Sequence, residues 1–263
     1  MGVVYLEGHE QYSMRDNAGA DTEAAVFVRY QGQRLDEVRL VAANCTVDGG
    51  DQNVYLFNGV SLKESFDQLA NWALGEKGLR KNAAEGATLA VAYHDDQRVE
   101  DLLERVARER DPHAAFWLGS ARGARGLETL QRLVRDQDDD LREQAVVGLA
   151  MSPEENAVDV LLNLAHHDDE EDVRRQAIFW LGQKASERIV AEIGRIVDED
   201  PDIEIKKHAV FALSQRSDDE SVPYLIKQAR THPHPEIRKT AIFWLGQKDD
   251  PRALSFIEEI LSR

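Results

Sequence analysis

AIFWLGQK, at residues 177–184, returns unchanged at residues 241–248, and a shorter relative, AAFWLG, stands at residues 114–119. Such close copies within one chain indicate tandem structural repeats. A faint further copy at Ala87 predicts an irregular first unit. The alanine of the motif marks the register of the clear units, with successive steps of 31, 32, 32 and 32 residues, at Ala114, Ala145, Ala177, Ala209 and Ala241.

The residues around each marked alanine have the spacing of an amphipathic helix. An aliphatic residue lies four positions before the alanine in most units and a leucine four positions after it, which places all three on one helical face. Acidic residues and proline at the start favour a helix N-terminus. Gly182 and Gly246 are expected to end their helices in a left-handed turn, which glycine tolerates.

A second amphipathic helix is expected in every unit. Apolar residues lie 13, 16 and 20 positions after the marked alanine, as in Leu254, Ile257 and Leu261 of the last unit. One helix pair cannot bury its apolar stripes alone, so neighbouring pairs must stack. The sequence therefore predicts a mainly α protein, with a right-handed α-α superhelix, or solenoid, over residues 87–263. Five clear units and one irregular first unit make up this range.

The repeated units resemble a known family. Their period of about 31 residues, the D-x-x-[VI]-R opening of the first helix and its A-[IV]-x-x-L-G close are similar to the short HEAT-like repeats of phycobilisome lyases. The segment at residues 45–50, with Asn58-Gly59-Val60-Ser61 further on, resembles a module of uncharacterised bacterial HEAT-repeat proteins. The resemblance implies a fold and no single function, because the family includes lyases, hydroxylases, glycosylases and plain scaffolds.

Residues 1–60 differ from the repeats and predict a small β-rich region. Residues 24–30 and 37–43 are rich in valine and aromatic residues and alternate in polarity, which predicts a β-hairpin, and residues 53–57 predict a third strand. Residues 61–86 predict a helix and a linker, with Ser61 as N-cap and Glu64 as its capping-box partner. We expect this N-terminal α+β part to cap the open end of the solenoid.

Composition and charge narrow the class of partner. The 263-residue chain has a formal net charge of −17, which disfavours nucleic acid and anionic lipid and favours protein partners with basic surfaces. No stretch approaches the roughly 18 consecutive apolar residues of a membrane helix, and no secretion signal is evident at the start. We therefore expect a soluble protein of the cytoplasm or the periplasm, without membrane insertion, whose oligomeric state the sequence leaves open.

No catalytic or metal-binding arrangement is evident in the sequence. Cys45 is interpreted as a buried strand-end residue, because no histidine partner can be assigned to it. Residues 166–172 and 232–235 contain potential ligands, but they occupy the polar turns between repeats and are interpreted as solvated loops. Deoxyhypusine hydroxylases, whose fold the repeats resemble, use His-Glu dipeptides of their repeats as iron ligands, and the single such pair here, His9-Glu10, precedes the repeats. We expect no cofactor, no metal and no catalytic residue.

Two further rows of residues recur at fixed positions and predict contacts between repeats. Three residues before the marked alanine, a basic residue is expected to bridge to acidic or carbonyl groups of the neighbouring repeat, as Arg142, Arg174, Lys206 and Arg238. Three residues after it, large and small residues alternate, which favours close packing over a ligand site, in the row Trp117, Gly148, Trp180, Ala212 and Trp244.

The residues that differ between repeats are the candidates for binding. Positions 11, 15, 18 and 22 after the marked alanine form one stripe of the second helix, which we expect to line the concave surface. We predict a non-catalytic scaffold that binds a protein or peptide partner there; the alternative is a bilin lyase-like or chaperone-like protein that handles a bound small molecule. The candidate residues are Arg132, Asn163, Arg195, Lys227, Val160, Tyr224 and Phe256.

Overall fold

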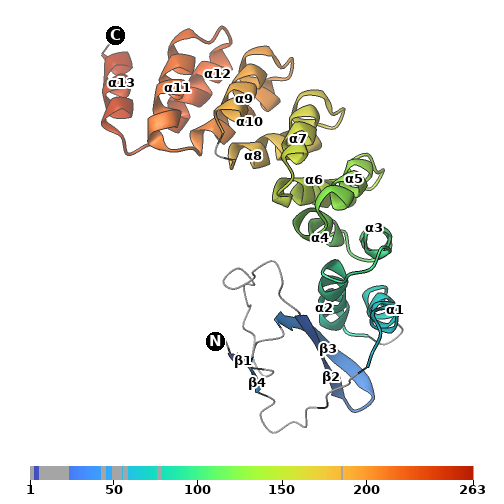
Figure 1. The fold of residues 1–263 in the computed structure, drawn as a ribbon. Helices are drawn as coiled ribbons and strands as arrows, with labels where there is room; N and C mark the ends of the chain where they lie inside the picture. The colour runs from blue at the N-terminus through green and yellow to red at the C-terminus, as the bar shows by residue number, and fades with distance from the viewer. Residues whose placement is uncertain are drawn as a thin grey trace. The chain divides into compact units, whose positions relative to one another are not determined.

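The computed structural model describes residues 3–5, 24–42, 46–48, 55, 59–75, 79–184 and 186–262. These residues form four strands and thirteen helices (Figure 1). The chain divides into two compact units, residues 1–117 and residues 118–263. The mainly α fold with a small N-terminal sheet is therefore confirmed.

The first unit contains the expected β-hairpin. Strand β2 (Ala24–Gln31) pairs antiparallel with β3 (Arg34–Ala42), and Gly32, at φ +64°, lies in the short turn between them. Strand β1 (Val3–Tyr5) pairs in parallel with β4 (Thr46–Asp48), a pairing that the sequence pattern did not indicate. The predicted third strand at residues 53–57 lies outside the described residues except for Tyr55.

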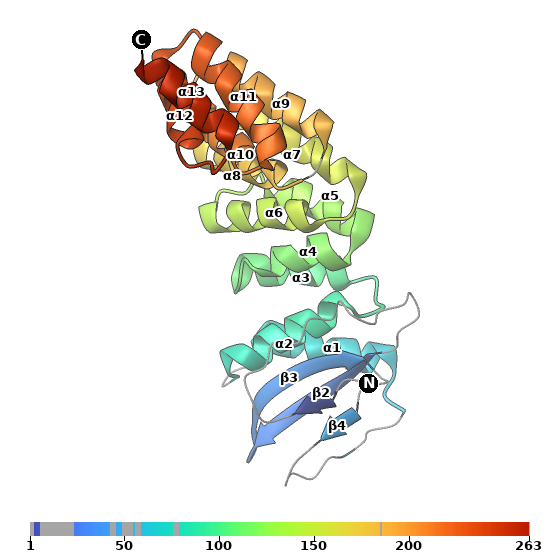
Figure 2. The same cartoon turned by 90° about the vertical axis from the view of Figure 1, so that its left-hand side faces the viewer.

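Three helices lie entirely within the first unit: α1 (Leu62–Ala73), α2 (Lys81–Ala92) and α3 (Val99–Glu109). Ser61 and Glu64 form the predicted capping box at the start of α1. Strand β3 packs against α2 (Figure 2). Gly86 permits this contact, because a Cβ atom there would lie 1.9 Å from the carbonyl oxygen of Val38.

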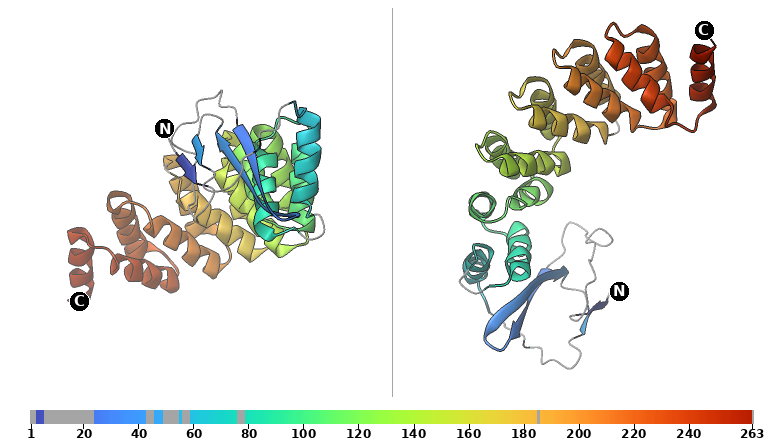
Figure 3. Two further views of the ribbon diagram at one scale, coloured as in Figure 1. Left: turned by 90° about the horizontal axis from the view of Figure 1, so that it is seen from below. Right: turned by 180° about the vertical axis from the view of Figure 1, so that it is seen from behind.

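The chain from residue 114 onward is a stack of helix pairs, seen from two further sides in Figure 3. The marked alanines lie in the first helix of each pair and are buried. The first helices are α4 (Ala114–Ala121), α6 (Asp139–Met151), α8 (Glu171–Gly182), α10 (Ile203–Ser214) and α12 (Pro235–Leu245). The second helices are α5 (Gly123–Leu133), α7 (Glu155–His167), α9 (Glu187–Glu199), α11 (Asp218–Thr231) and α13 (Pro251–Leu261).

The glycine of the repeated motif has a different role from the one expected. Gly182 is the last residue of α8, and its φ is not positive. Gly246 has a helical φ of −65°. The glycine instead lets the next first helix approach, because a Cβ atom on Gly119 would lie 1.8 Å from the carbonyl oxygen of Gly148. A Cβ atom on Gly182 would likewise lie 3.1 Å from the Cβ atom of Ala212. The prediction that these glycines end their helices in a left-handed turn was wrong. The repeat uses the small size of glycine at this position, which allows close helix packing, and not its conformational freedom.

The basic row before each marked alanine makes the predicted bridges to carbonyl groups. Each side chain donates to a main-chain oxygen at the end of the preceding second helix or in the turn after it, where helix carbonyls lack partners. The bonds run from Arg142 to Asp136 (2.7 Å), from Arg174 to Asp168 (3.0 Å), from Lys206 to Asp198 (2.7 Å) and from Arg238 to His232 (2.9 Å).

Candidate functional site

The two helix layers of the second unit are packed to different degrees. Neighbouring first helices contact each other, α6 with α8, α8 with α10 and α10 with α12. Among the described residues, the second helices α5, α7, α9 and α11 make fewer contacts with one another. The second helices are therefore packed less closely against one another than the first helices α6, α8, α10 and α12.

The predicted polar candidates lie on the second-helix layer. Arg132 on α5, Asn163 on α7, Arg195 on α9 and Lys227 on α11 are exposed. Arg132 donates a hydrogen bond of 3.3 Å to the hydroxyl oxygen of Thr129, and the Arg195 guanidinium pairs with Glu192. These four side chains are accessible to a partner.

The predicted apolar candidates are much less accessible. Val160 and Tyr224 are half-buried, and burial of the Tyr224 hydroxyl raises its pKa. Phe256 is only 4% exposed, and the Arg230 guanidinium carbon lies 4.8 Å from the centre of its ring. The assignment of Phe256 to a binding surface is therefore wrong.

The reason is the orientation of α13, which contacts α11 and α12. Ala253 and Phe256 face these helices and are buried, whereas Leu254 and Leu261, which were expected in the core, are 55% and 81% exposed. The buried stripe thus begins one position earlier than the sequence pattern suggested. Phe256 is a core residue of the last pair.

A groove of about 970 Å³ lies between α5 and α7 and brings together Arg132, Val160 and Asn163. Six carboxylates and three guanidinium groups line it, with a few half-buried or buried aliphatic side chains. Arg195, Lys227, Tyr224 and Phe256 are not among its lining residues. The structure therefore unites three of the seven candidates in one surface hollow.

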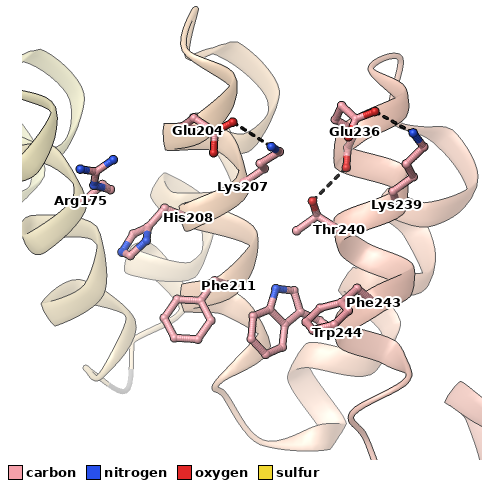
Figure 4. Close-up of a pocket in the computed structure, with 10 residues that line it drawn as sticks. All are labelled: Arg175, Glu204, Lys207, His208, Phe211, Glu236, Lys239, Thr240, Phe243 and Trp244. Atoms are coloured by element: carbon pink, nitrogen blue, oxygen red, sulfur yellow. Dashed lines mark hydrogen bonds and ion pairs between the residues drawn. The ribbon is translucent and has the colours of Figure 1, made fainter.

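A second surface, which the sequence reasoning missed, lies on the exposed side of the first helices. A groove of about 500 Å³ crosses α8, α10 and α12, and Figure 4 shows the side chains that line it. The ring centres of Phe211 on α10 and Trp244 on α12 are 5.0 Å apart, and Phe243 meets Trp244 edge-on, also at 5.0 Å. On α8, Phe179 and Trp180 form a similar pair at 5.3 Å.

These aromatic residues are not the buried spacers that the pattern of large and small residues suggested. Trp180 and Trp244 are half-buried, and Phe243 is 58% exposed. The sequence contained a usable signal, because a phenylalanine two positions after the marked alanine lies about 200° around the helix from the buried face. That phenylalanine recurs as Phe116, Phe179, Phe211 and Phe243.

Charged pairs within each helix flank the aromatic groove. The Arg175 guanidinium pairs with Glu171 and Asp172 of α8. Lys207 pairs with Glu204 at 2.8 Å, and Lys239 pairs with Glu236 at 2.8 Å. The hydrogen bond from the Lys207 ammonium to Glu204 raises the lysine pKa. The three cations occupy equivalent positions on successive helices and form a row beside the aromatic rings (Figure 4).

His208 also lines this groove, on the side that faces Arg175 (Figure 4). Burial and the nearby charge of Arg175 lower the pKa of its imidazole, which is therefore neutral at pH 7. Its Nε2 atom is buried without a hydrogen-bond partner among the described residues, as is the Oε1 atom of Gln176 at the equivalent position of α8. Buried polar atoms are usually paired, so both are candidates for contact with a bound molecule or water.

The turns that contain histidine have mixed surroundings. His166 Nε2 lies 3.4 Å from the Glu192 carboxylate, and His234 Nδ1 accepts the N–H of Glu236 at the start of α12. His232 was expected in a solvated loop, but it is 3% exposed and its Nε2 lies 3.2 Å from the carbonyl oxygen of Val197. That prediction was wrong, because the ring bridges two neighbouring repeats.

Within the described ranges, no group of three or more His, Cys, Asp and Glu side chains is placed to hold a metal ion. No described helix is long and apolar enough to cross a membrane. Cys45, His9 and Glu10, which were weighed as possible reactive or ligating residues, lie outside the described residues.

Comparison with known proteins identifies the repeats. The chain matches the family described as HEAT repeats at residues 112–182, 158–231 and 190–263, overlapping matches that together span more than half of its length. No curated protein matches the chain.

Three solved structures show distant similarity. Human deoxyhypusine hydroxylase in complex with glycerol is 17% identical, with 77% of this chain and 80% of that chain covered and a TM-score of 0.39. Two engineered proteins are each 18% identical and cover 75% of this chain. The alignments cover 90% and 92% of their own chains, with TM-scores of 0.33 and 0.30. These likenesses are too distant to carry a function to this chain.

Proposed function

This chain belongs to the HEAT repeat family, and from that premise we propose that it is a non-catalytic scaffold that binds an extended segment of a partner protein across α8, α10 and α12. The observation that carries the proposal is the groove in which Phe211, Phe243 and Trp244 lie together. Aromatic side chains, above all Trp and Tyr, are enriched among the few residues that dominate the binding energy of protein interfaces.

The exposure of Phe243 supports a partner at this groove. Its side chain is 58% exposed beside Trp244, so a large apolar area remains in contact with water. Covering such a side chain contributes on the order of 1 kcal/mol or more to binding. The edge-on contact with Trp244 also holds the ring in place, which reduces the entropy lost on binding.

The spacing of the first helices favours an extended segment. Helices that pack directly against each other have axes about 8–10 Å apart. Three residues of a polyproline II chain complete one turn and advance roughly 9 Å, so every third side chain points to the same side, whereas the side chains of a β-strand alternate between its two faces. A segment that runs along the stack therefore presents every third side chain to the aromatic residues of successive helices, at Phe179, Phe211 and Phe243.

The polar groups of the groove suit the backbone of such a segment. Lys207 and Lys239 carry donors for its carbonyl groups, and the Nε2 atom of His208 lacks a partner that an N–H group could supply. The second-helix residues Arg195 and Lys227 remain predicted contacts for a larger partner.

A crosslinking experiment tests the location directly. A photoreactive phenylalanine analogue is placed at Phe243 in one variant and at Leu254 in another, and the crosslinked partner is identified by mass spectrometry. Leu254 is the matched control, because it is 55% exposed and lies on α13 outside the groove. We expect a specific adduct from position 243 only.

Affinity measurements with the captured partner complete the test. Phe243→Ser should weaken binding by about tenfold or more, whereas Leu254→Ser should retain it. If both variants bound the partner with equal affinity, the partner would have to bind outside this groove. Absorbance of a bound pigment in the purified protein, with no protein adduct, would instead favour the lyase-like alternative.

A further inference from the structure

The groove between α5 and α7 contains carboxylates without partners. Glu128 lies on the α5 side, and Asp169 and Glu170 lie in the turn that follows α7. No hydrogen bond or ion pair engages these three carboxylates within the described part of the chain. Glu170 occupies the N-cap position of α8 without making the side-chain capping bond.

The remaining carboxylates of the groove already have contacts. Asp136 accepts the N–H of Asp138 at 3.1 Å, and Asp168 accepts the N–H of Glu170 at 3.0 Å. Asp159 pairs with Arg188 of α9 at 2.6 Å. The chain itself holds these acidic groups, and Arg188 offsets the charge of Asp159, so the unpaired carboxylates Glu128, Asp169 and Glu170 contribute most to the negative charge of the groove.

The cations that line the groove do not neutralise it. Arg142 donates to the Asp136 carbonyl at 2.7 Å and to the Asp139 carboxylate at 2.5 Å, so its charge is already engaged. Arg132 and Arg135 are the other two guanidinium groups, against six carboxylates in all. The groove therefore has an excess of negative charge, within a chain whose net charge is −17.

We propose that this groove binds a segment of a partner protein that is rich in arginine or lysine. Charge complementarity favours a positively charged segment, because such a segment would contact carboxylates on both sides of the groove. Val160 and Leu164 offer apolar contact to the aliphatic stems of such side chains, and Asn163 can bond the backbone. No residue lines both this groove and the aromatic groove, so variants of one leave the lining of the other unchanged.

A defined peptide provides the test. The probe is a fluorescein-labelled ten-residue peptide in which arginine and serine alternate, and its binding to the full chain is followed by fluorescence anisotropy in about 0.1 M salt. The same peptide with citrulline in place of arginine controls for charge. We expect the arginine peptide to bind and the citrulline peptide not to bind.

Two double variants with the same change in net charge locate the site. Glu128→Gln with Asp169→Asn removes unpaired carboxylates from opposite walls and should weaken binding roughly five- to tenfold. Glu187→Gln with Glu258→Gln changes exposed carboxylates outside the groove and should weaken it less than about twofold. Circular dichroism and thermal unfolding establish that both variants are folded.

A single variant gives the opposite effect. Arg135→Ala removes an exposed cation from the groove and should tighten binding by roughly threefold. Equal loss of affinity in the two double variants, or no binding by the wild-type chain, would overturn the proposal. Displacement of the probe by Mg²⁺, under conditions where NaCl of equal ionic strength has no effect, would assign the groove to a small cation instead and equally overturn it.

Discussion

Lys184 connects two repeats: its Nζ atom donates a hydrogen bond of 2.9 Å to the carbonyl oxygen of Ala150 in the last turn of α6. Arg216 repeats the contact one unit later, with a bond of 2.9 Å to the Lys184 carbonyl, and Lys248 donates to the Arg216 carbonyl at 3.3 Å. Carbonyl groups at helix C-termini lack intrahelical donors and carry partial negative charge, so a cation suits them. The lysine of AIFWLGQK is therefore an inter-repeat cap.

Replacement of Lys184 by methionine should lower the free energy of unfolding by about 1–3 kcal/mol, because the Ala150 carbonyl loses a charged donor. Lys227→Met is the matched control, since Lys227 is exposed on α11 and should change stability by less than about 0.5 kcal/mol. Urea unfolding followed by circular dichroism measures both. Equal losses in the two variants would contradict the capping role.

Glycine-to-alanine substitutions at two positions distinguish two effects on stability, the loss of a close helix contact and the gain in helix propensity. Gly119→Ala should destabilise the protein by about 1–3 kcal/mol, because the added Cβ would lie 1.8 Å from the Gly148 carbonyl oxygen and force α4 and α6 apart. Gly194→Ala on α9 should instead stabilise it by roughly 0.5–1 kcal/mol, since the nearest atom is 3.9 Å away. Thermal unfolding midpoints of the two variants should therefore move in opposite directions.

The stack itself could be predicted because its signal is repeated. The marked alanine and the leucine four positions later are buried in each complete unit, as in Ala177 with Leu181. An error at one position is corrected by the equivalent position of the next unit, so five copies determine the helix faces together. The hairpin and the capping box at Ser61 followed from equally local chemistry.

The candidate site could be predicted only in part, because its location depends on contacts between repeats. The buried face of α13 is set by its contacts with α11 and α12, which place Phe256 in the core. The position of Phe243, about 200° around the helix from the buried face, indicated its exposure, but the groove beside it forms only when α8, α10 and α12 stack. The groove at Asn163 lies between α5 and α7, whose centres, residues 128 and 161, are 33 residues apart in sequence, roughly one repeat.

Stability should depend on pH through His208. Burial and the charge of Arg175 lower its pKa in the folded protein, so the unfolded chain takes up the proton first as the pH falls. The free energy of unfolding should therefore be fully maintained above the unfolded pKa of about 6.5 and fall as the pH moves from there toward the folded value. NMR titration of the His208 ring measures the shift, and His208→Gln should reduce the slope of stability against pH in this range. A ring that titrates above 6.5 would reverse the sign and refute the prediction.

Two neighbouring residues of α13 distinguish a core position from a surface position. Phe256→Ala should lower the free energy of unfolding by about 3 kcal/mol, because its ring is 4% exposed and packs beneath Arg230. Leu254→Ala should change it by less than about 0.5 kcal/mol, because that side chain is 55% exposed. Denaturant unfolding of the full chain measures both, and binding of the captured partner is compared at a temperature where both variants are folded. A Phe256→Ala variant that kept its stability but lost the partner would restore Phe256 to the binding surface and show that the buried face of α13 had been assigned wrongly.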